Sequence, residues 1–348
     1  MKISEYLIID SIGSGGFGTI FRGIQGNGPS RRIVALKLIK EKFSSNEVFK
    51  TQFLKEIKTT FKLSHPNIVQ VYNFGEEHGR LFCAMEYVEG KSLRDWQSSM
   101  QRRNVVMPIP LVIHIILECC KALHYAHNFK NSLTLEKEPL IHRDVSPHNI
   151  LISFDGQVKL VDFGMAKIDE SCRNLKADKT QTGLLKGKPA YMSPEYIRGS
   201  HYDHRIDQFA LGVIFWEMLT HSRLFDGKNN IEILRKVDKC EIPLPRFHNQ
   251  DVSHELQEIV LKCLNHNYRK RFSSLEILHN HLLKLLYAEY PDFSPPDLKE
   301  FIHGFYHQPI EHSRDKLKRL TTASLLNQAM HSKSQKPLKF HNKGKKSA

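Results

Sequence analysis

Alternation of apolar and polar positions predicts that the chain begins with strands. Residues 6–21 contain an apolar run, a turn with four glycines and a second apolar run. The residues that follow the glycines, Thr19-Ile20-Phe21, are β-branched or aromatic, so we expect the turn to close a hairpin rather than to open a helix. Further strand-like runs occupy residues 32–39 and 81–87. The first part of the chain is therefore expected to be rich in β-structure.

A helical period follows the strand at 32–39. Its apolar stripe recurs at every fourth position, at Phe49, Phe53, Ile57 and Phe61. Ser44 and Glu47 have the spacing of a capping box, so we expect this helix to begin near Ser44. Residues 109–128, 211–216 and 277–287 then predict mainly helical structure in the second part of the chain.

Composition and charge change this picture little. The chain has 348 residues, of which 40% are hydrophobic, enough for a sizeable core in one large or two modest domains. The formal net charge is +14, and residues 331–348 hold six lysines and no acid. The excess of positive charge is thus concentrated in the tail, which weakens the case for a basic groove elsewhere.

Residues 308–348 are expected to form a basic, flexible tail, because they lack clear periodicity after Leu326 and are rich in Lys, Ser, Gln and Asn. Such a tail could tether the protein to nucleic acid or to an anionic surface, or it could simply be solvated. Basic residues are not interleaved with aromatic ones, so nucleic acid is not an expected partner.

Cysteine usage and hydropathy indicate a cytoplasmic protein without a membrane span. The six cysteines, at 83, 119, 120, 172, 240 and 263, show no metal-ligand spacing and are expected to be reduced thiols. The sequence contains no signal-peptide pattern and no uninterrupted apolar run of about 18 residues. His124 and His127 share a helix face, but no third ligand lies near them in the sequence, so a metal site is not expected there.

Candidate chemistry gathers in the middle of the chain. Asp144, Asn149 and Asp162 stand close to two short apolar runs. Asp144 could accept a proton from a hydroxyl, whereas Asn149 and Asp162 are hard oxygen ligands suited to Mg²⁺ on nucleotide phosphates. Each of them alone would more often be a turn former. Lys37 is a lone cation in an apolar strand, where it needs a phosphate or a carboxylate as its partner.

These motifs resemble the protein kinase family. His142-Arg143-Asp144 with Asn149, followed by Asp162-Phe163-Gly164, is similar to its catalytic signature, and the glycine turn and Lys37 match its nucleotide-binding motifs. The Ser-Pro-His sequence after Asp144 is similar to a bacterial subgroup of eukaryotic-like Ser/Thr protein kinases.

The resemblance covers about residues 6–285 and implies the α+β, two-lobed kinase fold. We expect a small β-rich N-lobe at 6–88 and a larger helical C-lobe at 89–285. Residues 286–307 should add a helical extension docked on the C-lobe, including a short amphipathic helix at 298–306. The flexible tail would begin at residue 308.

Roles for individual residues follow from the resemblance. ATP would lie under the glycine turn and against the hinge, with Mg²⁺ on Asn149 and Asp162 and with Asp144 as the base. Glu56 would pair with Lys37, although a solvated helix glutamate is an equally good interpretation of Glu56. The implied nucleotide contacts are Gly13, Gly15, Gly16, Gly18, Ile20, Ala35, Lys37, Met85, Glu86 and Val88.

Two positions depart from the family pattern. Ser146 stands where most Ser/Thr kinases carry a lysine that touches the transferred phosphate, and Lys188 stands where they usually have a threonine. Our hypothesis is that Lys188 restores the missing cation from the other side of the cleft. The alternative is that Lys188 faces solvent. His148 replaces a glutamate that often selects basic substrates, so the sequence predicts no substrate preference.

Residues 162–195 would form an activation loop. Arg143 is a guanidinium suited to holding a phosphate, and this implies regulation by phosphorylation at Thr180 or Thr182, with Ser171 as a further candidate. The alternative is a polar loop without a regulatory mark. Two structural roles are also implied: Asp207 would brace the catalytic loop, and Arg271 would pair with Glu195.

The sequence therefore predicts an enzyme that transfers phosphoryl groups from ATP to Ser/Thr hydroxyls of protein substrates, with Mg²⁺ as cofactor and with autophosphorylation of its activation loop. The first alternative is a catalytically weak kinase fold that serves as a binding or scaffold module. The second is a small-molecule phosphotransferase, which the Asp162-Phe163-Gly164 and Ser193-Pro194-Glu195 motifs disfavour.

Overall fold

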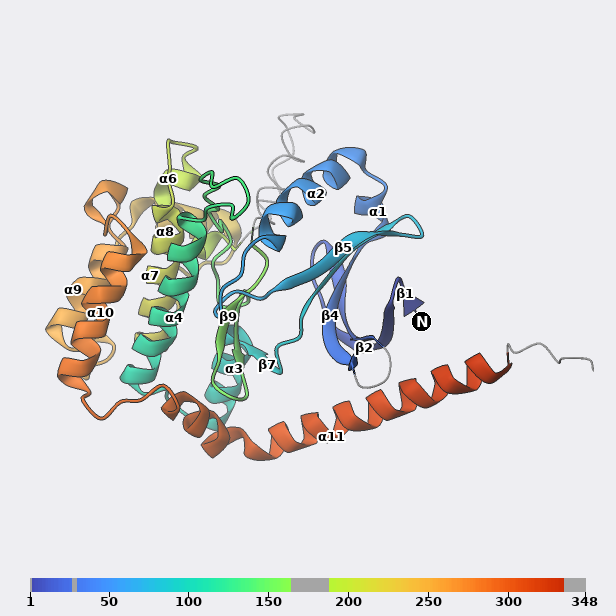
Figure 1. Ribbon diagram of the computed structural model, residues 1–348. Coiled ribbons are helices and arrows are strands. Elements are labelled where there is room, and N and C mark those ends of the chain that lie inside the picture. The colour runs from blue at the N-terminus through green and yellow to red at the C-terminus, as the bar shows by residue number, and fades with distance from the viewer. Residues whose placement is uncertain (1, 27–29, 164–187, 335–348) are drawn as a thin grey trace, which may run out of the picture.

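The computed structural model describes residues 2–26, 30–163 and 188–334, and the side chains of its last helix up to Leu326 (Figure 1). The small lobe is an antiparallel six-stranded sheet in the order β1-β2-β3-β4-β6-β5. Its strands are β1 (Lys2–Ile3), β2 (Tyr6–Ser14), β3 (Gly18–Gln25), β4 (Arg32–Ile39), β5 (Val71–Glu77) and β6 (Arg80–Glu86). The glycine turn joins β2 to β3 as a hairpin, as the sequence predicted.

Strand alternation in β4 decides which residues face the nearby helix. Val34, Leu36 and Leu38 pack on one face of the sheet, in a cluster that includes Tyr6. Ile39 packs on the other face, against the phenylalanines of the helix α2 (Glu47–Phe61). Because Lys37 has the same parity as Ile39, its side chain is directed to the face that α2 covers.

The start of α2 differs from the sequence prediction. Asn46 is its N-cap, and the Asn46 side chain accepts a hydrogen bond from the Phe49 amide at 2.9 Å. Ser44 instead ends a separate short helix, α1 (Glu41–Ser44), and its hydroxyl accepts a bond from the Leu81 amide of β6. The predicted capping box at Ser44 is therefore wrong, because a contact with the sheet uses this hydroxyl.

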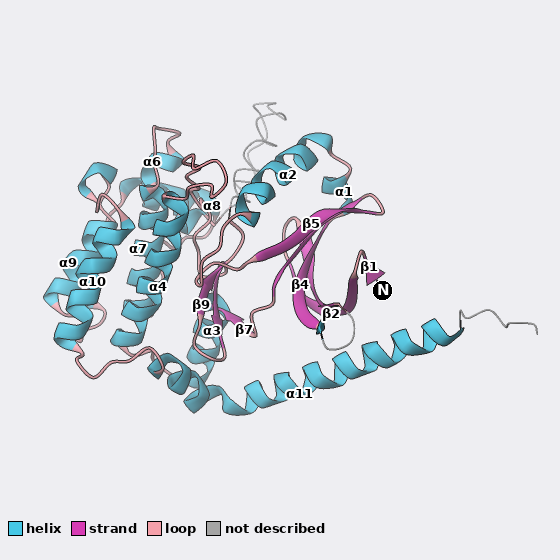
Figure 2. Ribbon diagram, viewed as in Figure 1, coloured by secondary structure: helices cyan, strands magenta, loops and turns pink. Residues whose placement is uncertain are grey.

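In its described residues the large lobe is helical apart from a small sheet of β7 (Gly90–Ser92), β8 (Ile150–Ser153) and β9 (Val158–Leu160) (Figure 2). Its main helices are α3 (Leu93–Arg103), α4 (Ile109–His127), α7 (Arg205–Thr220), α8 (Asn230–Lys239), α9 (His254–Cys263) and α10 (Leu275–Glu289). Shorter pieces are α6 (Pro194–Ile197) and three 3₁₀ turns, η2 (Pro189–Tyr191), η3 (Pro245–Phe247) and η4 (Tyr268–Lys270). Within the described ranges α4 alone has the length and hydropathy of a membrane-crossing helix, and 67% of that stretch is buried inside the protein.

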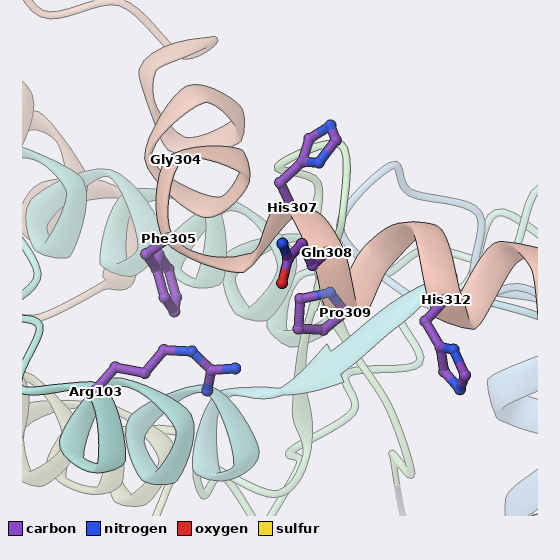
Figure 3. Close-up of a pocket in the computed structure, with 7 residues that line it drawn as sticks. All are labelled: Arg103, Gly304, Phe305, His307, Gln308, Pro309 and His312. Atoms are coloured by element: carbon purple, nitrogen blue, oxygen red, sulfur yellow. The ribbon is translucent and has the colours of Figure 1, made fainter.

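The C-terminal helix α11 (Asp297–Ser334) is much longer than predicted. The sequence predicted a helix that ends at 306 and a flexible tail that begins at 308, and the tail prediction is wrong for 308–334, which are helical. Leu298, Ile302, Tyr306 and Ile310 are buried at four-residue spacing, so one apolar stripe continues past Pro309. The ribbon changes direction between Gly304 and Pro309, where an open pocket forms against Arg103 (Figure 3).

Contacts of α11 join it to the linker between the lobes. Tyr306 packs edge-on against Trp96 of α3, with ring centroids 5.1 Å apart, and its hydroxyl accepts a bond from Lys91. Arg314 lies 3.3 Å from the Glu89 carboxylate in the linker and 3.5 Å from Asp155. Further along, α11 runs beside β2 of the small lobe (Figure 1). One helix therefore contacts both lobes and the linker.

Replacing Tyr306 with alanine tests the anchoring of α11. Tyr306 is 7% exposed, so Tyr306→Ala should destabilise the protein by about 3 kcal/mol, the usual cost of removing a buried aromatic ring. Urea unfolding followed by tryptophan fluorescence checks this, because Trp96 is one of only two tryptophans. Tyr287→Ala, at a site that is 50% exposed, is the matched control. Equal midpoints for the two variants would contradict the assignment.

Candidate active site

The loop that carries Asp144 is held by one buried carboxylate. Asp207, on α7, is 1% exposed and accepts hydrogen bonds from the amides of His142 and Arg143, each at 2.8 Å. The Nε2 atom of His127 on α4 lies 2.8 Å from the same carboxylate. The predicted bracing role of Asp207 is thus confirmed. His127 is therefore a hydrogen-bond partner of this carboxylate. The described residues contain no cluster of three metal-ligand side chains.

Opposing effects set the protonation of Asp207. Burial raises the pKa of this carboxyl group, whereas His127 and the amide of His142 lower it, and the net pKa lies below its usual value. The carboxylate is therefore ionised at neutral pH. Its two amide bonds fix the loop around Arg143, whose φ of 65° lies in the left-handed region.

Asp144 and Asn149 are joined directly. The Nδ2 atom of Asn149 donates to the Asp144 carboxylate and to the Asp144 carbonyl, both at 2.8 Å. These bonds orient the Asp144 carboxylate and also close the loop between Asp144 and Asn149. Because Nδ2 faces Asp144, the Oδ1 atom of Asn149 is the atom that could ligate a metal ion.

Asp162, in the large lobe, pairs with Lys37 of the small lobe. The Lys37 ammonium is 2.7 Å from the Asp162 carboxylate, and the Lys37 residue is only 8% exposed. Burial raises the pKa of Asp162, but Lys37 lowers it more strongly together with other nearby charges, so the net pKa lies below its usual value. An ionised Asp162 fits the requirement for a Mg²⁺ ligand.

The predicted pair between Lys37 and Glu56 is not formed in this structure. Glu56 is 4% exposed on α2 and accepts a bond from Gln52 on the same helix at 3.1 Å. Lys37 instead uses the nearer carboxylate of Asp162, because a buried ammonium needs a close counter-charge. The alternative of a solvated Glu56 is also wrong, since this side chain is buried.

The residues around Asp162 connect the two lobes. The ring of Phe163 packs on His142 with centroids 4.4 Å apart, and His142 Nε2 lies 3.0 Å from the Val161 carbonyl. Thr60 of α2 donates to the Phe163 carbonyl at 3.3 Å. The position of α2 is thereby tied to the segment that presents Asp162.

The glycine turn is shaped so that neighbouring backbone atoms can come close to it. A Cβ at Gly18 would lie 2.5 Å from the Leu38 carbonyl oxygen, so a larger residue would force the strands apart. Gly15 donates its amide to the Gly18 carbonyl at 2.8 Å, which tightens the turn. A Cβ built at Gly13 would meet nothing within 4 Å, so there is open space beside the turn.

The other implied nucleotide contacts come together through the sheet register. Ile20 lies opposite Lys37, and Ala35 lies opposite Met85. At the hinge, the Glu86 amide donates to the Gln70 carbonyl at 2.9 Å, and its side chain pairs with Lys159 at 2.8 Å. Glu86 could therefore offer an adenine only its carbonyl oxygen, so an N–H donor at the hinge would have to come from Val88.

Lys188 reaches the catalytic loop. Its ammonium donates to the hydroxyl of Ser146 at 2.6 Å, and Ser146 has no exposed surface. Burial lowers the pKa of Lys188, whereas the carboxylates of Asp144 and Asp162 raise it, and the net pKa lies below its usual value. The solvent-facing alternative for Lys188 is wrong. The structure brings together the two positions at which the sequence departs from the family pattern.

The surroundings of His148 are cationic. Burial lowers the pKa of His148, Lys188 and Arg94 lower it further, and the resulting pKa is about 4. Arg94 is held there by a bond from its amide to the Pro147 carbonyl at 2.9 Å. The sequence analysis did not single out Arg94, because its position on α3 gave no local signal.

The sequence also did not predict a hydrogen-bond network close to Lys188 that joins Tyr191, Glu217 and Arg223. The Tyr191 hydroxyl donates to the Glu217 carboxylate at 2.8 Å, and Arg223 bonds both side chains. Glu217 is 4% exposed. An acid within the apolar stretch of α7 was the available signal for this network. The predicted pair of Arg271 with Glu195 is confirmed, with two bonds of 2.6 and 2.8 Å.

The predicted phosphorylation sites are not part of the described structure. Ser171, Thr180 and Thr182 lie outside the described residues. Arg143 is half-buried, and its Nε atom has no hydrogen-bond partner among the described residues.

Comparison with known proteins agrees with this geometry. The protein kinase domain family matches residues 6–283. The tyrosine-protein kinase MasK of Myxococcus xanthus is 32% identical over 91% of this chain and 48% of its own length. The serine/threonine-protein kinases pkn3 of Myxococcus xanthus and PrkC of Bacillus subtilis are 34% and 30% identical over 78% of this chain, and over 48% and 39% of their own lengths. The chain thus spans half or less of these relatives.

A solved structure supports the fold. The kinase domain of Mycobacterium tuberculosis PknI superposes with a TM-score of 0.60 at 22% identity, covering 82% of this chain and 97% of that chain. At this identity the likeness shows the two-lobed kinase fold alone. The α+β prediction is therefore confirmed.

Neutralising Asp207 tests the brace of the catalytic loop. Asp207→Asn removes the buried charge that His127 and two amides share, and it should cost about 3 kcal/mol of unfolding free energy at neutral pH. The folded-state pKa of Asp207 is lowered, so its contribution is complete above the unfolded value of about 3.9 and is lost as pH falls through the folded pKa. The difference from wild type should therefore shrink in acid.

Chemical denaturation of both proteins between neutral and acidic pH measures this effect. Asp251→Asn, at an exposed position, is the control and should change stability by less than about 0.5 kcal/mol. Similar losses for the two substitutions, or a loss from Asp207→Asn that grows as pH falls, would contradict the assignment.

Proposed function

The chain belongs to the protein kinase family, and we propose that it transfers the terminal phosphoryl group of ATP to serine and threonine hydroxyls of protein substrates. One observation carries the proposal: the structure combines a carboxylate oriented by an amide, Asp144 with Asn149, and the Lys37–Asp162 pair. This set supplies a proton acceptor, oxygen ligands for a metal ion and a cation for phosphate.

The chain's own residues fit ATP and Mg²⁺. The tight glycine turn leaves open space beside Gly13, and its backbone amides could approach phosphates there. Asn149 Oδ1 and the Asp162 carboxylate would hold Mg²⁺, which when bound neutralises charge on the phosphates. Lys37, next to Asp162, would orient the same phosphates.

Asp144 acts on the substrate hydroxyl. Its carboxylate is held in one orientation by Asn149, so it can accept a hydrogen bond from a hydroxyl placed in line with the phosphate. As the new P–O bond forms and the bond to ADP breaks, the hydroxyl proton passes to Asp144. Most of the rate enhancement comes from positioning and from electrostatic stabilisation.

Ser/Thr specificity is the preferred assignment. Pro147 agrees with the Ser/Thr-type pattern, although Ser146 before it does not, and several relatives carry the name serine/threonine-protein kinase. Tyrosine is the second candidate, because MasK, which matches 91% of the chain, is named a tyrosine-protein kinase. The identity of the phosphorylated amino acid separates the two.

We further propose activation through the segment at 164–187, which contains Thr180 and Thr182. The support is Arg143, which stands beside the base and has a buried Nε without a partner among the described residues. A phosphate on either threonine would give this guanidinium a charge-assisted partner.

The first experiment is autophosphorylation with MgATP. Asp144→Asn keeps the shape of the side chain but removes the proton acceptor, so incorporation should fall by about 100-fold or more. Isotope incorporation and mass spectrometry give the rate and the modified residues. Asp251→Asn should behave like wild type.

Each outcome of this experiment is informative. Phosphoserine or phosphothreonine in wild type alone would support the proposal, and phosphotyrosine alone would transfer it to the tyrosine class. Binding of ATP without transfer to the chain or to added proteins would favour a binding module.

Alanine at both loop threonines tests the activation proposal. Thr180→Ala/Thr182→Ala should lose the rise in activity that follows preincubation of wild type with MgATP, because Arg143 would gain no phosphate partner. Progress curves with a protein substrate measure this rise. An unchanged rise in the double variant would contradict activation at these positions.

A further inference from the structure

Lys188 is a cation that enters the site from outside the catalytic loop. It immediately precedes η2 in the segment 188–195, and its ammonium donates to Ser146, two residues after Asp144. Both Asp144 and Asp162 act on its pKa, so its charge lies within reach of the two carboxylates of the site. The ammonium is therefore placed where phosphoryl transfer would occur.

The two carboxylates near Lys188 already have hydrogen-bond partners of their own among the described residues. Asp144 is bonded to Asn149, and Asp162 is paired with Lys37. Within the described residues, the ammonium of Lys188 donates its side-chain hydrogen bond to a neutral hydroxyl, although burial opposes its charged state. Lys188 is half-buried, and a partly desolvated ammonium without a carboxylate bonded to it is stabilised when another anion comes close. The phosphate of a bound nucleotide is the anion that this site is built to receive.

Backbone and side-chain contacts anchor the segment that carries Lys188. The Lys188 carbonyl accepts a bond from the Tyr191 amide at 2.9 Å, and the Tyr191 hydroxyl is fixed by Glu217 on α7. At the other end, Glu195 makes two bonds to Arg271. The position of the ammonium therefore depends on how this segment is folded onto the large lobe.

We propose that Lys188 supplies the cation that contacts the transferred phosphoryl group, and that the active site is complete only when the segment 188–195 is docked. The inference rests on the proposed function. During transfer, the bond from phosphorus to the ADP oxygen breaks, a bond to the substrate oxygen forms, and the hydroxyl proton goes to Asp144. Lys188 stays protonated throughout and stabilises the charge on the phosphoryl oxygens.

The arrangement has a physical consequence for control. A cation on the catalytic loop would be fixed by the Asp207 brace at all times. A cation on the segment 188–195 instead depends on the Tyr191–Glu217–Arg223 network and on the Glu195–Arg271 pair. Any event that displaces the segment would then remove the cation from the site.

Isosteric replacement separates charge from packing. Lys188→Met keeps most of the side-chain volume and removes the charge, so kcat should fall on the order of 100-fold while the KM for ATP changes by less than about 3-fold. Lys188→Arg keeps a cation and should retain at least about ten times the kcat of Lys188→Met. The surface substitution Lys236→Ala on α8, where the side chain is 51% exposed, should match wild type.

Relocation of the cation is the second arm. Ser146→Lys/Lys188→Thr places the lysine on the catalytic loop and should recover at least about ten-fold in kcat over Lys188→Thr. Thermal melting of each variant accompanies the kinetics, because Ser146 is buried. If the double variant does not fold, the comparison of Lys188→Met with Lys188→Arg decides whether the charge at position 188 is needed for transfer.

A double-mutant cycle tests the dependence on the segment. Tyr191→Phe removes the hydroxyl that Glu217 holds and should lower kcat several-fold in wild type, but by less than about 2-fold in Lys188→Met, because the cation it positions is already gone. Additive losses would overturn the coupling. Wild-type kcat in Lys188→Met would overturn the role of Lys188 alone, whereas no transfer by wild type, equal to Asp144→Asn, would overturn the proposed function as well.

Discussion

The buried carboxylate of Asp207 is the constraint on which the site depends. It accepts the amides of His142 and Arg143 and pairs with His127, so three elements of the large lobe meet at one ion. An ionised acid at 1% exposure is tolerable only because these partners compensate its charge. The left-handed backbone at Arg143 and the position of Asp144 both follow from these bonds.

Both lobes contribute charged side chains to the candidate site. Lys37 is presented by a strand of the small lobe and Lys188 by a segment of the large lobe, while Asp144, Asn149 and Asp162 lie between them. Because the two cations sit on different parts of the fold, their separation depends on how the lobes are placed. The helix α11 contacts α3, the linker and β2, so it connects the two lobes physically.

Much of the site could be predicted from local sequence. The glycine turn, the strand with Lys37 and the catalytic motifs each lie within a few residues, so short-range patterns were sufficient. The predictions that were wrong depended on distant partners. The Ser44 hydroxyl bonds the Leu81 amide instead of capping α2, and Lys37 uses Asp162 rather than Glu56. The helix α11 extends past its predicted end at 306, where its buried apolar stripe continues to Ile310 and Tyr306 packs against Trp96 of α3.

The sequence by itself determined the family and the two-lobed fold, and it supplied the candidate residues for the chemistry, because all of these follow from motif spacing and from the period of apolar positions. Only the tertiary structure decided which of these residues pair. The meeting of Ser146 with Lys188 joins positions 42 residues apart, and that of Lys37 with Asp162 joins positions 125 apart. Such contacts depend on how the lobes and loops pack, and no local pattern encodes a distance between segments that the chain brings together only on folding.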